Sequence, residues 1–238
     1  MSQIDQSSVR NRLLRAMSPE DFASLAPHLT SDQAKKNAVL FRKGEPIETV
    51  WFIERGIGSI ITVSAEGQQV ENGLFGRDGF GPVAIVMGSD RTPYDGRVQI
   101  PDDCHRIHVD PFKKAVEQSP TLHGLLLRYV QTLSVQTAYT ALSNAVHPIE
   151  ERLARWLLMC HDRLETDEME LTHEFMSIML AVRRPSVTTS LHVLEGNGFI
   201  RAERVRVFMR DRAGLEEFAA DAYGPPEREY ERLIGPLR

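Results

Sequence analysis

The chain has 238 residues, of which 42% are hydrophobic and 26% charged, and its formal net charge is −5 at pH 7. This length and composition predict a soluble globular protein with two domains, each able to bury a core. The longest apolar runs, such as Leu125-Leu126-Leu127, are too short to cross a membrane, and the polar start Met-Ser-Gln-Ile-Asp-Gln excludes a secretion signal, so we expect a cytoplasmic location without membrane partners.

Only two cysteines are present, Cys104 and Cys160. Two are too few for a disulfide framework or for an iron–sulfur cluster that four thiolates hold. Cys160 falls on a predicted apolar helix and Cys104 on a predicted strand. We therefore expect both to be small core residues.

The N-terminal third of the chain changes from helical to strand-like periodicity. Two short amphipathic helices are predicted at 9–17 and 19–25, with Ser18 as the N-cap of the second. From about residue 38 to 109, short apolar runs alternate with turn signals such as Arg55-Gly56 and Glu66-Gly67. The predicted strands are 39–41, 50–53, 58–63, 70–75, 97–100 and 105–109. This spacing favours an antiparallel barrel or jelly roll, so the first domain is predicted to be mainly β.

A short helix is predicted at 111–119, followed after Pro120 by a long helix at 121–146. Apolar residues lie on nearly every side of the long helix, so more than its own domain must cover it, and a partner helix is the simplest cover. A subset follows the 4,3,4,3,4 spacing of a coiled-coil seam. The predicted dimer interface is Leu122, Leu126, Tyr129, Leu133, Gln136 and Thr140. His147-Pro148 then ends the helix, and an amphipathic helix follows at 148–159.

Residues 171–195 have the pattern of a helix-turn-helix. Thr172 is the expected N-cap of the first helix, a turn follows at 181–183, and a second helix begins at Arg184-Pro185. In that helix Val187, Leu191 and Leu194 form one buried stripe, while arginines, hydroxyls and an imidazole occupy the other face. Such a face suits a helix in a DNA major groove. The predicted DNA-binding residues are Thr172, His173, Arg183, Arg184, Pro185, Ser186, Thr188, Thr189 and His192. The alternative is an ordinary helical hairpin with a solvated polar face.

The following segment favours DNA binding over that alternative. Asn197-Gly198 can end the second helix, and 199–210 then alternates apolar residues with arginine, which predicts a small two-stranded wing. Between residues 171 and 212 there are seven arginines and four carboxylates, so this unit carries +3 on a chain of −5. A local basic patch on an acidic protein is typical of a module that binds double-stranded DNA.

The order of β-roll, long helix and winged helix-turn-helix resembles the Crp/Fnr family of bacterial transcription regulators. The segments with this resemblance are 44–56, Gly76-Arg-Asp-Gly-Phe-Gly81, 150–157, 171–172 and 182–188. The resemblance implies a homodimer that binds a two-fold DNA site, with one recognition helix per half-site and RNA polymerase as a further partner. It also implies that Arg184 contacts a base and that His173 and Ser186 contact phosphates. Pro185 and Thr189 replace a glutamate and a second arginine of the family.

The β-roll departs further from the family. The candidate effector pocket is Gly79, Phe80, Gly81, Pro82, Tyr94 and Asp95. Pro82 stands where cyclic-AMP-binding members have a glutamate for the ribose, and Tyr94-Asp95 stands where they have an arginine and a serine for the phosphate. Because an aspartate repels a phosphate, we expect that cyclic AMP is not used. No cofactor is expected, the effector is not identified, and a haem or metal held by His105, His108, His123 or His147 stays open.

The predicted fold is α+β, with an N-terminal domain at 1–118, a dimerisation helix at 119–146 and a DNA-binding domain at 147–238. The leading hypothesis is a transcription regulator, not an enzyme, whose β-roll biases the dimer helix and the spacing of the recognition helices. One alternative is a cupin-like metal enzyme, although His105 and His108 would lie on opposite faces of a strand. Another is a ligand-independent DNA-binding or interaction protein, in which the β-roll is only a scaffold.

Overall fold

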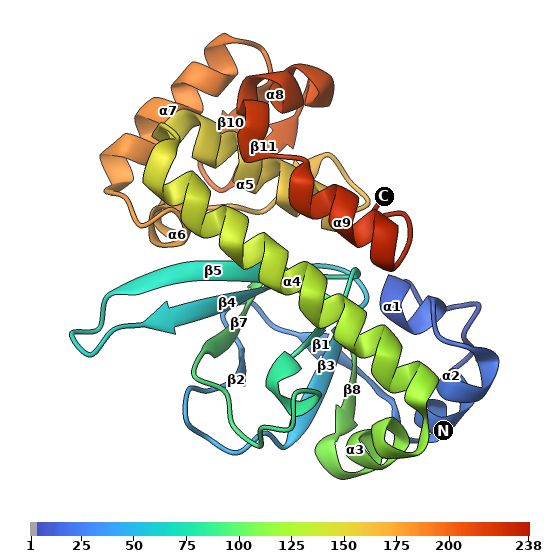
Figure 1. Cartoon of the computed structure of the whole chain (residues 1–238). Helices are drawn as coiled ribbons and strands as arrows, with labels where there is room; N and C mark the ends of the chain where they lie inside the picture. Colours follow the sequence, from blue (N-terminus) through green and yellow to red (C-terminus); the bar gives the residue numbers. More distant parts are fainter. Residues whose placement is uncertain (1–3) are drawn as a thin grey trace.

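The computed structural model describes residues 4–238, so the first three residues of the polar N-terminus lie outside the described part. The long helix α4 (Pro120–Val146) lies between a β-rich N-terminal part and a mainly helical C-terminal part (Figure 1). Within residues 4–238, no helix is long and apolar enough to cross a membrane. The architecture is the predicted α+β arrangement.

The N-terminal helices form where the sequence predicts them, with one shortened. Helix α1 (Arg12–Arg15) is only four residues long, because Asn11 is its N-cap and accepts a hydrogen bond from the backbone N–H of Leu14. Helix α2 (Pro19–Leu25) has the predicted bounds and the predicted cap, since Ser18 Oγ accepts from the N–H of Asp21 at 3.1 Å. A single 3-10 turn, η1 (Ala26–His28), leads into the β-roll.

Two four-stranded antiparallel sheets form the β-roll, which we define as residues 30–108. The first has the order β1-β8-β3-β6, with β1 (Thr30–Ala34), β8 (Asp102–His108), β3 (Thr49–Ile53) and β6 (Phe80–Gly81). The second has the order β2-β7-β4-β5, with β2 (Val39–Phe41), β7 (Asp95–Ile100), β4 (Ile57–Val63) and β5 (Gln69–Phe75). All six predicted strands are present, whereas β1 and β6 were not predicted. A short 3-10 turn, η2 (Val83–Ile85), follows β6.

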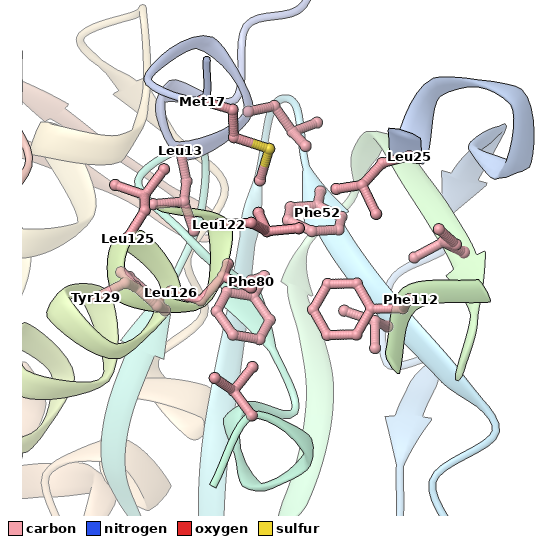
Figure 2. Packing of buried hydrophobic residues seen from close by; sticks show 14 of the residues in the cluster. Leu13, Met17, Leu25, Phe52, Phe80, Phe112, Leu122, Leu125, Leu126 and Tyr129 are labelled. Atoms are coloured by element: carbon pink, nitrogen blue, oxygen red, sulfur yellow. The ribbon is translucent and has the colours of Figure 1, made fainter. Parts of the chain in front are cut away.

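The core of this domain joins the β-roll to α4 and to α3 (Val109–Gln118). Phe80 lies at its centre, with ring centroids 5.3 Å from Tyr129 of α4 and 5.7 Å from Phe52 of β3 (Figure 2). Leu122 and Leu126 of α4 join the same cluster and are fully buried. One face of α4 is therefore closed by the chain's own β-roll.

That closed face is the one predicted to form the dimer interface, so this prediction is wrong. Leu122, Leu126 and Tyr129 are at most 1% exposed in the single chain, and Leu133 is buried beside Phe75. Gln136 is buried too. Its side chain accepts from the N–H of Leu74 at 2.8 Å and donates to the Leu74 carbonyl at 3.2 Å.

Thr140, the last predicted interface residue, is half-buried and donates to the Gln136 carbonyl. The exposed face of α4 lies on the opposite side of the helix and includes Leu127, Gln131, Ser134, Ala138, Ala141, Leu142 and Ala145. Apart from Leu142, these residues also follow a 4,3 spacing. Because α4 is apolar nearly all round, the spacing alone does not select the face.

The C-terminal part begins with α5 (Ile149–Arg163), which extends four residues beyond the predicted end. The helix-turn-helix is α6 (His173–Met179) and α7 (Arg184–Gly196). The wing is β10 (Ile200–Glu203) and β11 (Arg206–Met209), with β9 (Glu168–Met169) as a third strand against β11. Three further elements follow, namely α8 (Arg212–Ala219), η3 (Ala220–Ala222) and α9 (Pro225–Leu233).

Candidate DNA-binding surface

Local sequence signals shape the helix-turn-helix. Thr172 is the N-cap of α6 and accepts from the N–H of Phe175 at 3.2 Å, as predicted. The turn between the helices contains Ala181 with a φ of 51°, a left-handed conformation that reverses the chain. Helix α7 begins at Arg184, and Pro185 occupies its first turn, where a missing N–H costs no helical hydrogen bond.

The apolar stripe of α7 is fully buried, with Val187, Leu191 and Leu194 all at 0% exposure. Ser190 is buried on the same side and donates to a carboxylate oxygen of Glu150 in α5 at 3.0 Å. Ser190 is not among the predicted residues, although its position three residues after Val187 places it next to the stripe. This hydrogen bond fixes the rotation of α7 on α5.

With that rotation fixed, the opposite side of α7 faces outward. Arg183, Arg184, Pro185, Thr189 and His192 are exposed, and Ser186 and Thr188 are half-buried. Thr172 and His173, both half-buried, come from the start of α6. All nine predicted DNA-binding residues are thus exposed or half-buried on α6, on α7 or directly before these helices.

His173 connects the two helices on this surface. Its Nδ1 lies 3.0 Å from Oγ1 of Thr188, so the imidazole at the start of α6 is held against α7. Partial burial lowers the pKa of His173, and the nearby Arg184 and His192 lower it further. A phosphate at this position would raise the pKa of His173, because an anion favours the protonated ring.

The arginines of the predicted basic unit are not equivalent. Arg201 forms an ion pair with Glu203 at 3.0 Å and stacks over the ring of Phe208, while Arg206 pairs with Glu168 at 3.0 Å. Arg212 lies away from the wing in an ion pair with Asp162, 1% exposed, and with Glu216. These two carboxylates neutralise the charge of Arg212 within the domain. Within residues 4–238, the arginines of this unit that form no ion pair are Arg183, Arg184, Arg204 and Arg210.

The residues of the candidate effector pocket do not frame an opening. Gly79, Phe80, Gly81 and Pro82 are all buried, and a Cβ added at Gly79 would lie about 2 Å from the Tyr129 ring. Asp95 accepts from the N–H of Lys43 at 2.9 Å and pairs with Arg97 at 3.3 Å. Tyr94 is exposed. Gly79 and Phe80 thus serve the packing of α4 on the β-roll, whereas Gly81 lies against Phe75 and Phe41.

Aromatic side chains fill the space between the two sheets. Phe75 is fully buried, and its ring stacks on Phe41 with centroids 6.4 Å apart. A Cβ added at Gly58 or Gly81 would lie within 3 Å of the Phe75 ring. The backbones of β4 and β6 therefore lie directly against this ring.

The cysteines and histidines occupy the places that the sequence predicts. Cys104 and Cys160 are buried free thiols, and burial raises the pKa of Cys104 to about 12. His105 is buried and His108 is exposed, as expected for alternate positions on β8. Among residues 4–238, no three His, Cys, Asp or Glu side chains lie where they could share a metal ion.

Buried polar contacts join the β-roll to the C-terminal part. The carboxylate of Asp78, in the turn before β6, accepts two hydrogen bonds from Arg163 of α5 at 3.0 and 2.7 Å, and both side chains are at most 4% exposed. Glu71 of β5 accepts from the indole N–H of Trp156 in α5 at 2.8 Å. Buried hydrogen-bonded groups therefore connect the β-roll directly to α5.

Comparison with known proteins agrees with this geometry. Residues 151–218 match the family model of the Crp-like helix-turn-helix domain. The chain is 24% identical over 227 residues to a global nitrogen regulator of Synechocystis sp., covering 90% of this chain and 99% of that protein.

Two solved structures share the fold at 16% identity. One is a transcriptional regulator of the Crp/Fnr family from Eubacterium rectale, with a TM-score of 0.66 over 87% of this chain and 97% of that one. The other is FixK2 from Bradyrhizobium japonicum, with a TM-score of 0.69 over 81% of this chain and 98% of that one. Residues 151–218 accordingly form a Crp-like helix-turn-helix domain, and the chain as a whole has the fold of Crp/Fnr transcription regulators.

Proposed function

We propose that this regulator acts as a homodimer on a pseudo-palindromic DNA site, with one α7 helix in the major groove of each half-site. The observation that supports this most directly is the outward face of α7, where Arg183, Arg184, Thr189 and His192 are exposed. On this proposal Arg184 makes a bidentate contact with a guanine, while His173 and Ser186 contact phosphates. Half-sites then lie about one helical turn apart, roughly 34 Å.

The proposed dimer interface is the exposed face of α4. Leu127 is 41% exposed and Leu142 is 47% exposed, and the small residues Ser134, Ala138 and Ala141 lie between them. Two such faces allow a close approach of two α4 helices, which would remove both leucines from water. We propose domain boundaries at 118/119 and 146/147, so that α4 connects the β-roll to the DNA-binding domain.

We propose that the β-roll does not respond to cyclic AMP. The buried Gly79–Pro82 turn, the carboxylate of Asp95 and the aromatic filling around Phe75 all support this. The effector is a different molecule, or the β-roll acts as a scaffold alone. A thermal-shift screen with small metabolites distinguishes these two cases, and RNA polymerase is a further proposed partner.

In-vitro selection of bound DNA from a random duplex library tests the proposal. We expect a pseudo-palindromic consensus whose half-sites the wild-type chain binds cooperatively. Arg184→Ala should lose the preference at one base pair of each half-site. Arg55→Ala is the matched control, because Arg55 is exposed on the β-roll far from α7 in the sequence and should leave the consensus unchanged. A wild-type chain that enriches no sequence, or only an asymmetric one, would contradict the proposal.

A further inference from the structure

The segment after the helix-turn-helix returns to the other domain. We call residues 224–238, which contain α9, the C-terminal segment. The matched family model ends at residue 218, before this segment begins. In Figure 1, α9 lies along the middle of α4, near α1 of the N-terminal domain.

The two sides of residue 224 belong to different hydrophobic cores. Leu215 and Ala219 of α8 are fully buried in the core of the DNA-binding domain. Tyr230 and Leu237 of the C-terminal segment are buried in the core of the β-roll and α4, at 3% and 4% exposure. The chain thus passes from the core of one domain into the core of the other.

Hydrogen bonds fix the C-terminal segment to the N-terminal domain. The hydroxyl of Tyr230 donates to the carbonyl of Asp78 at 2.8 Å. Asp78 is also the buried partner of Arg163 in α5, so one residue of the β-roll binds both α5 and α9. Arg128 of α4 donates to the carbonyl of Leu233 at 3.1 Å, and Arg12 of α1 donates to the carbonyl of Pro236.

The residues directly before the segment are fixed to the DNA-binding domain. The hydroxyl of Tyr223 donates to Asp162 at the end of α5 at 2.8 Å, and Arg212 donates to both groups. Asp221 of η3 lies 3.0 Å from the ring of His147, which is where α4 ends. The route from α8 to α9 is therefore held to α5 and to the α4–α5 junction.

From this geometry we infer that the C-terminal segment locks the DNA-binding domain to the β-roll in one orientation and so sets the affinity for the full two-half-site operator. Within residues 4–238, the backbone otherwise passes between the domains only at the α4–α5 junction, around His147-Pro148. A rotation about that junction requires Tyr230 and Leu237 to leave the β-roll core. Because the outward face of α7 is exposed in the docked arrangement, docking orients this face without covering it.

The inference rests on the proposed function, since only a dimer on two half-sites depends on a fixed domain orientation. A single half-site contacts one DNA-binding domain and is indifferent to its orientation on the β-roll. Detachment of the segment should therefore weaken binding to the full operator and not to a half-site.

The experiment compares three full-length variants by hydrogen exchange and by affinity for the selected operator. Leu237→Asp places a carboxylate in an apolar core and should detach the segment, while Tyr230→Phe removes only the hydrogen bond to Asp78. Glu231→Ala is the matched control, because Glu231 is exposed on α9. Leu237 lies outside the helices, so its replacement leaves every helix sequence intact.

For Leu237→Asp we expect amide exchange in α9 to accelerate about tenfold or more, with α7 unchanged. Affinity for the full operator should fall about tenfold, and affinity for one half-site should change less than about twofold. Tyr230→Phe should show a smaller loss in the same direction, and Glu231→Ala should match the wild type.

Two results of the affinity measurement would overturn the inference. One is faster exchange in α9 with wild-type affinity for the full operator, and the other is an equal loss of affinity for full and half operators. A wild-type chain that binds no operator would refute the proposed function instead, and α9 exchange that Leu237→Asp leaves slow would still refute the role of the segment.

Discussion

We predict that Glu71 makes the stability of this protein depend on pH. It lies on β5 at the contact with α5, and its Oε1 accepts from the indole N–H of Trp156. Its Oε2 is buried without a hydrogen-bond partner in the described part of the chain. Burial raises the pKa of Glu71 from 4.5 to about 7, against the opposing effects of Ser59, Trp156, Arg155 and Arg163.

The magnitude follows from linkage. A difference of one pKa unit between folded and unfolded states corresponds to about 1.4 kcal/mol, so the full difference for Glu71 amounts to roughly 3 kcal/mol. The folded chain holds the Glu71 proton between pH 4.5 and about 7, where the unfolded chain has released it. The contribution of this group is therefore fully present below pH 4.5 and is lost as the pH rises through about 7.

Glu71→Gln removes the titration and keeps a side-chain oxygen for the Trp156 indole. We expect the difference in unfolding free energy between variant and wild type to move by roughly 3 kcal/mol in favour of the variant between pH 4.5 and pH 8. The glutamine amide leaves its own N–H groups poorly paired, at a cost of about 1–3 kcal/mol that does not depend on pH. The change in the difference with pH isolates the carboxylate.

Urea unfolding followed by tryptophan fluorescence measures this difference, since Trp156 is one of only two tryptophans and lies at the contact. His105 and His161, whose pKa values burial lowers, titrate in the same range with the opposite sign, but they act equally in both proteins. Glu66→Gln, at an exposed turn, is the matched control and should follow the wild type. Parallel pH profiles for wild type and Glu71→Gln would refute the reasoning.

The remaining predictions concern DNA, effector and dimer. Arg184→Ala should weaken operator binding by about 1–3 kcal/mol and relax one base-pair preference, whereas His173→Ala should weaken binding to all sequences alike. Gel-shift titration of substituted operators checks both variants. A uniform loss of affinity for Arg184→Ala speaks against a base contact. Calorimetry with cyclic AMP should give no micromolar binding, and operator affinity should be the same with and without it; a dependence on cyclic AMP would show that the β-roll accepts it. Leu142→Glu places like charges in the proposed α4 interface and should give monomers in sedimentation, whereas Leu133→Glu should instead lower the unfolding midpoint, because Leu133 is buried within the single chain. A dimeric Leu142→Glu chain with wild-type operator affinity would show that α4 pairs through another face.

The sequence alone predicted the parts of this fold that depend on neighbouring residues. The Thr172 cap, Pro185 in the first turn of α7 and the stripe of Val187, Leu191 and Leu194 act within one or two helical turns. The same holds for the six predicted strands, whose apolar runs and turn signals are local. These features placed the helix-turn-helix, the wing and the order of the domains.

Other features depended on partners that are distant in the sequence. Strand β1 is polar and mostly exposed, and it forms because β8 offers it an edge to pair with. Helix α4 is apolar nearly all round, so only the packing of Tyr129 on Phe80 decides that the predicted seam faces the β-roll. The pKa of Glu71 and the docking of Tyr230 on Asp78 likewise depend on contacts 85 and 152 residues apart. Periodicity states which residues must be covered, whereas only the tertiary structure decides what covers them, because burial is shared among all the surfaces that the chain brings together.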